Sequence, residues 1–374
     1  MAAVASVVVA VGTVSGLVSA LDEDDRGADE ARPEVTRPVS FAPLPAESSP
    51  TPSATRTASA SASPKRKASP TATPTPTRAA SQSAAASTRL YRHPESQVLD
   101  WVRDHSGDPR QALIKSRIAD QPAAVWFAEY APGTITARVR AVTGGGAASG
   151  RVPVVVAYAI PGRDCGGASE GGAPDLDAYD AWIDRFAAGL GSGEVVVILE
   201  PDSIAQADCL SSGQRAGRFA SLARAGRVLK AANPRARVYY DAGHSGWNPA
   251  AKQADLLRQA GAGSAASSDG VFSNVSNFHR TADEAAYDRQ VLAALGGPSS
   301  LGAIIDTSRN GNGAPADGEW CDPDGRSLGR TPTLDTGEPR IDGYLWVKLP
   351  GESDGCKGSP GTFTPSYAYD LASS

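Results

Sequence analysis

The chain has 374 residues, a formal net charge of −5 and a sequence pI near 5.5. Its only dense basic run is the short segment 65–67 (KRK), so the composition argues against a nucleic-acid-binding protein. A neutral or weakly polar ligand suits this charge balance better.

Residues 1–21 carry no charged side chain, and Val18-Ser19-Ala20 resembles the small-residue cleavage site of a secretory signal. An apolar stretch of this length can also act as an uncleaved membrane anchor. We therefore expect a secreted protein, with a domain tethered on the extracellular face of a membrane as the alternative.

Residues 22–88 lack the apolar side chains that a packed structure needs. The first part is charged, and residues 36–88 are dominated by Pro, Ser, Thr and Ala. Such a segment cannot offset the entropy of ordering, so we predict a disordered linker. The globular domain is then 89–374, a natural length for one (β/α) barrel.

Seven apolar runs recur in this domain with helical stretches between them. They are 125–130, 152–160, 195–199, 238–240, 271–275, 301–305 and 341–349. Several are nearly continuous, as in strands buried on both faces of a parallel sheet. The alternation predicts an α/β fold, and seven strands favour a TIM-barrel-like, incompletely closed (β/α) barrel. A doubly wound open sheet is the rival, but no nucleotide-binding glycine motif supports it.

The stretches between the runs have helical character. The segment 176–190 places apolar residues three and four positions apart, and 213–232 and 282–295 are similar. Thr281 and Glu284 have the spacing of a capping box at the start of the last of these helices.

The four cysteines, Cys165, Cys209, Cys321 and Cys356, all lie in the predicted domain. An even count behind an export signal predicts two disulfides, for which the sequence alone allows three pairings. A metal site is disfavoured because neither CxxC nor HxxxH spacing occurs.

Three carboxylates follow predicted strands: Asp164 after 152–160, Asp202 after 195–199 and Asp354 after 341–349. The active site of a (β/α) barrel lies at these strand ends. Glycosidic cleavage needs a carboxylic acid with a raised pKa, and usually a second carboxylate. We therefore predict Asp202 as the proton donor and Asp164 as the neighbour that raises its pKa. The alternative for any single Asp at a strand end is that it caps the helix that follows.

Other loops carry groups that suit a sugar. The loop 241–247 holds Asp241 and His244, and the loops 274–277 and 306–312 are dense in hydrogen-bonding side chains. Turn formation explains the last two equally well.

Tryptophan faces can stack on pyranose rings. Trp126, Trp247 and Trp320 are candidates, the last two because they lie in polar loops. Trp346 lies inside an apolar run and is predicted to belong to the core.

The motifs AYAIPGRDC, ILEPD, YYDAGHSGW, IIDTSRNGNG, EWCDP and LWVKLPGESDGC, in this order, resemble glycoside hydrolase family 6 over nearly all of residues 90–370. The resemblance implies a distorted, roughly seven-stranded (β/α) barrel that hydrolyses β-1,4-glucosidic bonds with inversion. It implies no metal and no organic cofactor. The absence of long loop insertions favours endo-cleavage over the exo-action of cellobiohydrolases.

The resemblance also assigns roles to residues. It makes Asp202 the general acid, Asp164 the pKa modulator and Tyr158 a residue that distorts the sugar. Asp354 is the proposed base, with proton transfer through a water chain as the alternative. The substrate-binding residues that it implies are Trp126, His244, Trp247, Asn277, Trp320, Lys348 and Glu352.

The family pattern implies the disulfides Cys165–Cys209 and Cys321–Cys356. Two positions depart from that pattern: Ala159 stands where many members have Asn, and Phe278-His279 stands where an aromatic pair including Trp is common. These changes affect glucan binding rather than the acids.

The leading hypothesis is an exported, monomeric, inverting endo-β-1,4-glucanase that acts on a polysaccharide. The alternatives are an exo-acting cellobiohydrolase, a non-catalytic surface-tethered glucan-binding protein, and a retaining glycosidase on the same barrel.

Overall fold

The computed structural model describes residues 89–374; the predicted signal or anchor (1–21) and linker (22–88) lie outside the described residues. Seven strands form one parallel sheet in which each strand pairs with the next along the chain. They are β1 (Val125–Phe127), β2 (Val154–Ala157), β3 (Val195–Leu199), β4 (Ala236–Asp241), β5 (Gly270–Ser273), β6 (Gly302–Asp306) and β7 (Ile341–Leu345).

The sheet curls until its two edges approach each other. The backbone N–H of Ala124, just before β1, donates to the carbonyl of Trp346, just after β7, at 2.9 Å. β1 and β7 form no ladder, so the barrel is incompletely closed. The predicted distorted barrel is confirmed, and the rival open sheet is wrong.

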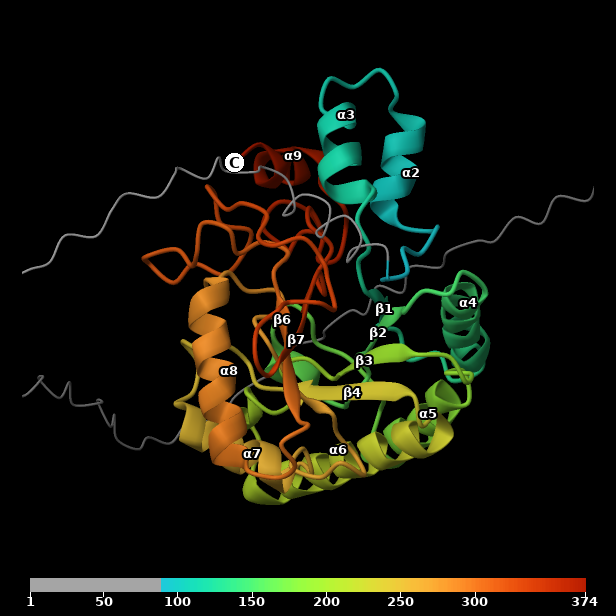
Figure 1. Ribbon diagram of the computed structural model, residues 1–374, viewed down its shortest axis with the longest axis vertical. Coiled ribbons are helices and arrows are strands. Elements are labelled where there is room, and N and C mark those ends of the chain that lie inside the picture. The colour runs from blue at the N-terminus through green and yellow to red at the C-terminus, as the bar shows by residue number, and fades with distance from the viewer. Residues whose placement is uncertain (1–88) are drawn as a thin grey trace, which may run out of the picture. The chain divides into compact units, whose positions relative to one another are not determined.

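Helices cover the outside of the curled sheet and connect its strands (Figure 1). They are α4 (Ile135–Ala148), α5 (Leu176–Ala187), α6 (Ser212–Ala232), α7 (Ala250–Gln259) and α8 (Thr281–Leu295). Each follows one strand and precedes the next, as parallel pairing of consecutive strands requires. Among residues 89–374, no helix is both long and apolar enough to cross a bilayer.

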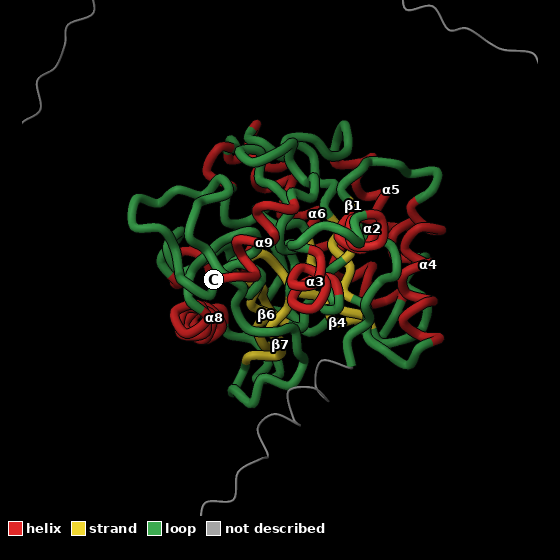
Figure 2. Tube along the Cα trace, turned by 90° about the horizontal axis from the view of Figure 1, so that it is seen from above, coloured by secondary structure: helices red, strands yellow, loops and turns green. Residues whose placement is uncertain are grey.

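Three further helices lie at one end of the barrel, over the strand ends in Figure 2. They are α2 (Gln97–Asp104), α3 (Gln111–Ile114) and α9 (Pro365–Ser373). Three short irregular helices complete the described chain: η1 (Lys115–Ala119), η2 (Arg163–Gly166) and η3 (Ala207–Cys209).

The pleat of each strand divides the apolar side chains between two cores. Along β2, Val155 packs with the helices, whereas Val154 and Val156 belong to the cluster that fills the barrel. This explains the continuous apolar runs, because both faces of each strand are buried. Trp346 is 1% exposed and packs with α2, α3 and α9, so its predicted place in a core is confirmed.

Some strands are shorter than the apolar runs that predicted them, whereas β3 matches its run and β4 is longer. The run 152–160 continues past β2 into a buried connection that includes Tyr158 and Ile160. The apolar residues that follow a strand therefore pack beneath the site, whereas those within the strand form the sheet.

The predicted capping box on α8 is wrong. Arg280 is the residue before the helix, and no side chain caps its first turn. The Thr281 hydroxyl instead accepts a hydrogen bond from Asn310 Nδ2 at 3.1 Å, and Glu284 reaches the loop after β4. Tertiary partners have replaced the local ones that the spacing suggested.

Candidate active site

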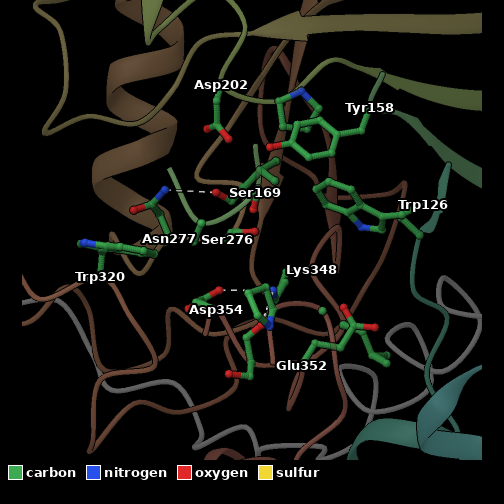
Figure 3. A pocket seen from close by; sticks show the side chains of 18 of the residues that line it. Trp126, Tyr158, Ser169, Asp202, Ser276, Asn277, Trp320, Lys348, Glu352 and Asp354 are labelled. Carbon is green, nitrogen blue, oxygen red and sulfur yellow. Dashed lines mark hydrogen bonds and ion pairs between the residues drawn. The ribbon is translucent and has the colours of Figure 1, made fainter. Parts of the chain in front are cut away.

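A cleft of about 1280 Å³ opens at the carboxyl ends of the strands. Asp241 and the loop 306–312, which the sequence also suggested, do not line it. Eleven other predicted site residues do, and Figure 3 shows most of them from close by. They are Trp126, Tyr158, Asp164, Asp202, His244, Trp247, Asn277, Trp320, Lys348, Glu352 and Asp354. The fold thus collects side chains from the loops after most of the strands into one groove.

Asp202 lies in a tight turn after β3. Glu200 and Asp202 both have left-handed backbone angles, with φ of 51° and 69°. This conformation is strained for residues other than glycine, so the turn depends on the contacts around it. In Figure 3 the Asp202 carboxyl and the Tyr158 hydroxyl point toward each other across the cleft.

Asp241, at the end of β4, holds this turn from behind. Its side chain is buried, and its Oδ2 accepts hydrogen bonds from the amides of Ile204 at 3.1 Å and Ala205 at 2.9 Å. Its Oδ1 accepts from the amide of Gly243 at 2.9 Å. One carboxylate therefore orders the segment after Asp202 and the loop after β4 together.

The surroundings of Asp202 raise its pKa well above the ordinary range of a carboxyl group. Burial is the main cause, followed by the negative charges of Asp241 and Asp164, while the Tyr158 hydroxyl acts in the opposite direction. Asp202 is therefore suited to keep a proton near neutral pH, as a general acid must. Sequence reasoning named Asp164 as a modulator but missed the effect of Asp241.

Asp164 lies on η2, a turn in which it and Cys165 have left-handed φ values of 56° and 49°. Its Oδ2 accepts the amide of Ser169 at 2.7 Å. Gly167 makes room for this arrangement, because a Cβ there would lie 2.5 Å from Asp164 Oδ2. The carboxylate is therefore held by its own loop while it remains in the cleft.

Two links join the Asp164 loop to the Asp202 loop. The Cys165–Cys209 disulfide connects η2 to η3. The buried guanidinium of Arg218 on α6 donates to the carbonyls of Pro161 at 2.9 Å and Gly162 at 3.0 Å, and to that of Ser203 at 3.4 Å. Arg218 was not predicted, because a helix residue gives no local signal that it reaches two loops.

Glu200 fixes the ends of β2 and β3 against each other. Its fully buried carboxyl group accepts the amides of Ala159 and Ile160 at 2.9 to 3.0 Å. Burial raises its pKa to about 7, although these amides favour the charged form. The acid at the start of the EPD motif is thus part of the scaffold beneath Asp202.

Asp354 lies on the opposite part of the cleft and is paired with two cations. Its Oδ2 is 2.6 Å from Arg309 Nη1, and its Oδ1 is 3.2 Å from Lys348 Nζ. Arg309 is itself buried, and it lies over the ring of Phe278 with 4.4 Å from guanidinium carbon to ring centroid. Both oxygens of Asp354 are therefore engaged within the protein.

Asp322 shapes the loop that carries Asp354. Its buried carboxylate accepts the Ser353 hydroxyl at 2.6 Å and the amides of Asp354 at 2.7 Å, Lys357 at 2.9 Å and Cys356 at 3.0 Å. Burial would raise its pKa, but these hydrogen bonds outweigh it and lower the pKa to about 2. The neighbouring Cys321–Cys356 disulfide joins the same two loops, so both disulfide pairings expected from the family pattern are present.

One wall of the cleft is built from stacked rings. His244 stacks on His279 with 4.2 Å between ring centroids, and Trp247 lies 5.2 Å from His244. Burial and the adjacent His279 lower the pKa of His244 to about 4, so this wall is neutral near pH 7. The amide of Gly246 donates to His244 Nδ1 at 3.2 Å, which leaves Nε2 to carry the proton of the neutral ring.

Aromatic faces line the remaining length of the cleft. Trp126 is fixed by a hydrogen bond from its indole nitrogen to the carbonyl of Val347 at 2.7 Å, and it meets Tyr158 edge-on at 5.2 Å. Trp320 is 56% exposed, an unusual fraction for so large an apolar ring. Glu352 lines the cleft on the far side of Lys348 from Asp354 in Figure 3, and its burial raises its pKa to about 7 despite the nearby Lys348.

Comparison with known proteins decides the family. The profile of "Glycosyl hydrolases family 6" matches residues 81–370. This chain belongs to glycosyl hydrolase family 6. It is therefore a glycosidase, as the motif order suggested.

Curated relatives and solved structures agree with this family assignment. The chain is 53% identical to Endoglucanase 1 of Streptomyces sp. (strain KSM-9), over 78% of this chain and 79% of that protein. It is 49% identical to Endoglucanase A of Thermobispora bispora, over 77% of this chain and 62% of that protein. The endoglucanase Cel6 from Mycobacterium tuberculosis superposes with a TM-score of 0.70 and 37% identity, covering 77% of this chain and 99% of that one.

Among residues 89–374, no three His, Cys, Asp or Glu side chains are grouped as they would be around a metal ion.

Proposed function

We propose that this glycosidase is an endo-β-1,4-glucanase that cleaves cellulose and related β-glucans with inversion, Asp202 being its general acid. The observation that carries the proposal is the placement of Asp202. A carboxyl group with a raised pKa lies in a cleft that aromatic rings, uncharged polar groups and several charged side chains line together. Such a cleft fits a neutral polymer of sugar rings.

Asp202 donates its proton to the glycosidic oxygen as the bond to the leaving sugar breaks. Tyr158 lies beside this carboxyl group and crowds the sugar ring at the cleavage point, which favours a distorted ring close to the transition state. A water molecule then attacks the anomeric carbon from the face opposite to the leaving group. The configuration is inverted, and the proton of that water has to leave the site.

Proton removal from the water is assigned to a chain of waters in the vicinity of Asp354. Both oxygens of the Asp354 carboxylate are already paired, one with Arg309 and one with Lys348, so neither is free to accept the attacking water. Asp354 therefore acts chiefly by fixing these cations and the loop around them. This assignment favours the second of the two alternatives that the sequence left open.

Glucan rings stack on the tryptophans, and polar side chains bind their hydroxyls. Trp247 and Trp320 line the groove, and Asn277, Lys348 and Glu352 contribute hydrogen-bonding groups to it. The relatives at 49% and 53% identity carry endoglucanase names. The Mycobacterium tuberculosis Cel6 structure holds methyl-cellobiosyl-4-deoxy-4-thio-β-D-cellobioside. Both facts support endo-action on a β-glucan.

Export and a monomeric state are further parts of the proposal. The uncharged segment 1–21 and the two disulfides support a domain that works outside the cytoplasm, either secreted or tethered through that segment. A single chain contributes all residues of the cleft, so catalysis needs no second copy.

The deciding experiment is proton NMR of the products from a soluble β-1,4-glucan within minutes of mixing, with Asp202→Ala alongside. We expect α-anomer first from the wild type, and a drop of about 10²- to 10⁴-fold in the variant. On a substrate with a good leaving group, the activity of Asp202→Ala should fall far less, because that leaving group departs without protonation. Early β-anomer would contradict inversion, and bound glucan without any product would favour the binding-protein alternative.

Endo-action is tested on the same substrate by viscometry. An endo-acting enzyme lowers the viscosity long before many reducing ends appear. A viscosity that falls only in proportion to released cellobiose would assign the exo-acting alternative.

A further inference from the structure

We propose that Glu284, which lies behind the cleft wall on α8, is a positioning residue that holds the ring stack of His244 and Trp247 in its glucan-binding place. This inference rests on the proposed function, because it assumes that these rings bind glucan. Glu284 does not line the cleft, so any effect on substrate must pass through other residues.

The first contact fixes the backbone of the ring-bearing turn. Glu284 is fully buried, and its Oε1 accepts the amide of Ser245 at 2.9 Å. Ser245 lies directly after His244 and two residues before Trp247. One hydrogen bond from the barrel wall therefore ties down the centre of the turn that presents both rings.

The second contact passes through His279. Ser245 Oγ lies 3.4 Å from His279 Nδ1, and the His279 ring is the one that stacks on His244. The backbone of His279 is held at its N–H by Asn274 Oδ1 at 3.0 Å and at its carbonyl by Asn310 Nδ2 at 2.9 Å. His279 is thus a rigid support, and Ser245 connects it to Glu284.

A second buried acid lies on the same helix but contacts a different element. Asp288, one helical turn after Glu284, is also fully buried, and its Oδ2 accepts the Ser273 hydroxyl of β5 at 3.0 Å. Glu284 Oε2 and Asp288 Oδ1 have no hydrogen-bond partner within the described part of the chain. Two buried acids four residues apart on one helix face without a cation are costly unless they retain a proton.

The pKa shifts of Glu284 and Asp288 are both upward, which agrees with this geometry. Burial is the main cause that raises the pKa of both carboxyl groups, and each is further raised by a neighbouring negative charge. A neutral Glu284 still accepts the Ser245 amide through its carbonyl oxygen. The amide side chain of Gln has the same shape and the same acceptor, so it should replace Glu284 with little loss.

The test measures cellotetraose binding by calorimetry in an Asp202→Ala background, so that no turnover is needed. Glu284→Met keeps the buried volume but removes the acceptor, and we expect a Kd about tenfold higher, the size of one lost hydrogen bond to a buried group. Glu284→Gln should stay within about threefold of the parent. Glu284→Asp has a shorter side chain, so its carboxyl oxygen no longer reaches the Ser245 amide. This variant tests the same contact if Glu284→Met does not fold.

Two controls separate positioning from general destabilisation. Asp288→Ala removes the other buried acid on the same helix together with its acceptor for the Ser273 hydroxyl, so it should lower stability while leaving the Kd unchanged. In a Trp247→Ala background, Glu284→Met should add less than about twofold, because the ring that it positions has gone.

Two results would overturn the inference. One is an unchanged Kd in folded Glu284→Met and Glu284→Asp; the other is a full tenfold loss that persists without Trp247. Wild-type protein that binds cellotetraose but releases no product would instead refute the proposed function and leave these binding results valid.

Discussion

The carboxylate of Asp241 is, after burial itself, the strongest influence that raises the pKa of Asp202. Burial also raises the pKa of Asp241 itself, against the pull of the amides that it accepts. The residue that holds the turn after Asp202 is therefore also the one that helps Asp202 to keep its proton.

Replacing Asp241 with Asn should shift the pH profile of kcat. Removing a negative charge lowers the pKa of Asp202, so its acid form is lost at a lower pH. We expect the alkaline limb to move down by about one pH unit, while the Asn oxygen retains an acceptor for the Ile204 and Ala205 amides. An alkaline limb that stays in place would assign the raised pKa of Asp202 to burial alone.

Asp322 should make the fold sensitive to strong acid. Its pKa of about 2 lies below the ordinary 3.8, so its stabilising effect is complete above about pH 4 and is lost as the pH falls toward 2. At neutral pH this contribution is about 2 kcal/mol, because the side chain is fully buried and each pKa unit is worth about 1.4 kcal/mol. Urea unfolding of wild type and Asp322→Asn at pH 7 and at pH 2.5 measures it.

The difference between the two proteins should be large at pH 7 and small at pH 2.5. Asp322→Asn should also reduce kcat, since the Asp354 loop loses its anchor. An equal stability difference at both pH values would mean that the Asp322 charge does not contribute.

The Cys165–Cys209 bridge should support both stability and catalysis. It closes a loop with a sequence separation of 44, for which the chain-entropy relation gives about 4 kcal/mol. Replacing both cysteines with Ser should lower the melting temperature and reduce kcat several-fold at temperatures where the protein is folded, because the Asp164 loop becomes free to move away from Asp202.

Removal of Cys321–Cys356 is the matched control. Its separation of 35 predicts a similar loss of stability. Since that bridge lies on the Asp354 side, the alkaline limb of the pH profile should not change, whereas loss of Cys165–Cys209 should move it downward. Identical pH profiles for the two variants would contradict a specific role of the first bridge.

Trp320 should affect substrate binding and not the stability of the fold. Its ring is 56% exposed, so Trp320→Ala should change the free energy of unfolding by about 0.5 kcal/mol or less. The KM for a soluble glucan should rise several-fold because a stacking face is lost. The contrasting variant is Trp346→Ala, which empties a buried site and should cost about 3–5 kcal/mol.

Much of this protein was determined by the sequence itself. The order of its β-strands followed from seven apolar runs, because in a barrel of this kind consecutive strands are neighbours and each turns its C-terminal end to the site. Asp164, Asp202 and Asp354 were found for the same reason: each lies in the loop that follows a strand, and these loops meet at one end of the barrel.

Only the tertiary structure decided how these acids differ. A pKa depends on burial and on charges a few ångströms away, and those charges come from distant parts of the chain. Burial and the negative charge of Asp241 on the next strand raise the pKa of Asp202, whereas Asp354 forms ion pairs with Arg309 and Lys348. The same holds for Glu284, whose spacing suggested a local cap but whose carboxyl group binds Ser245 from another loop, because a fully buried acid takes whichever donor the packing brings to it.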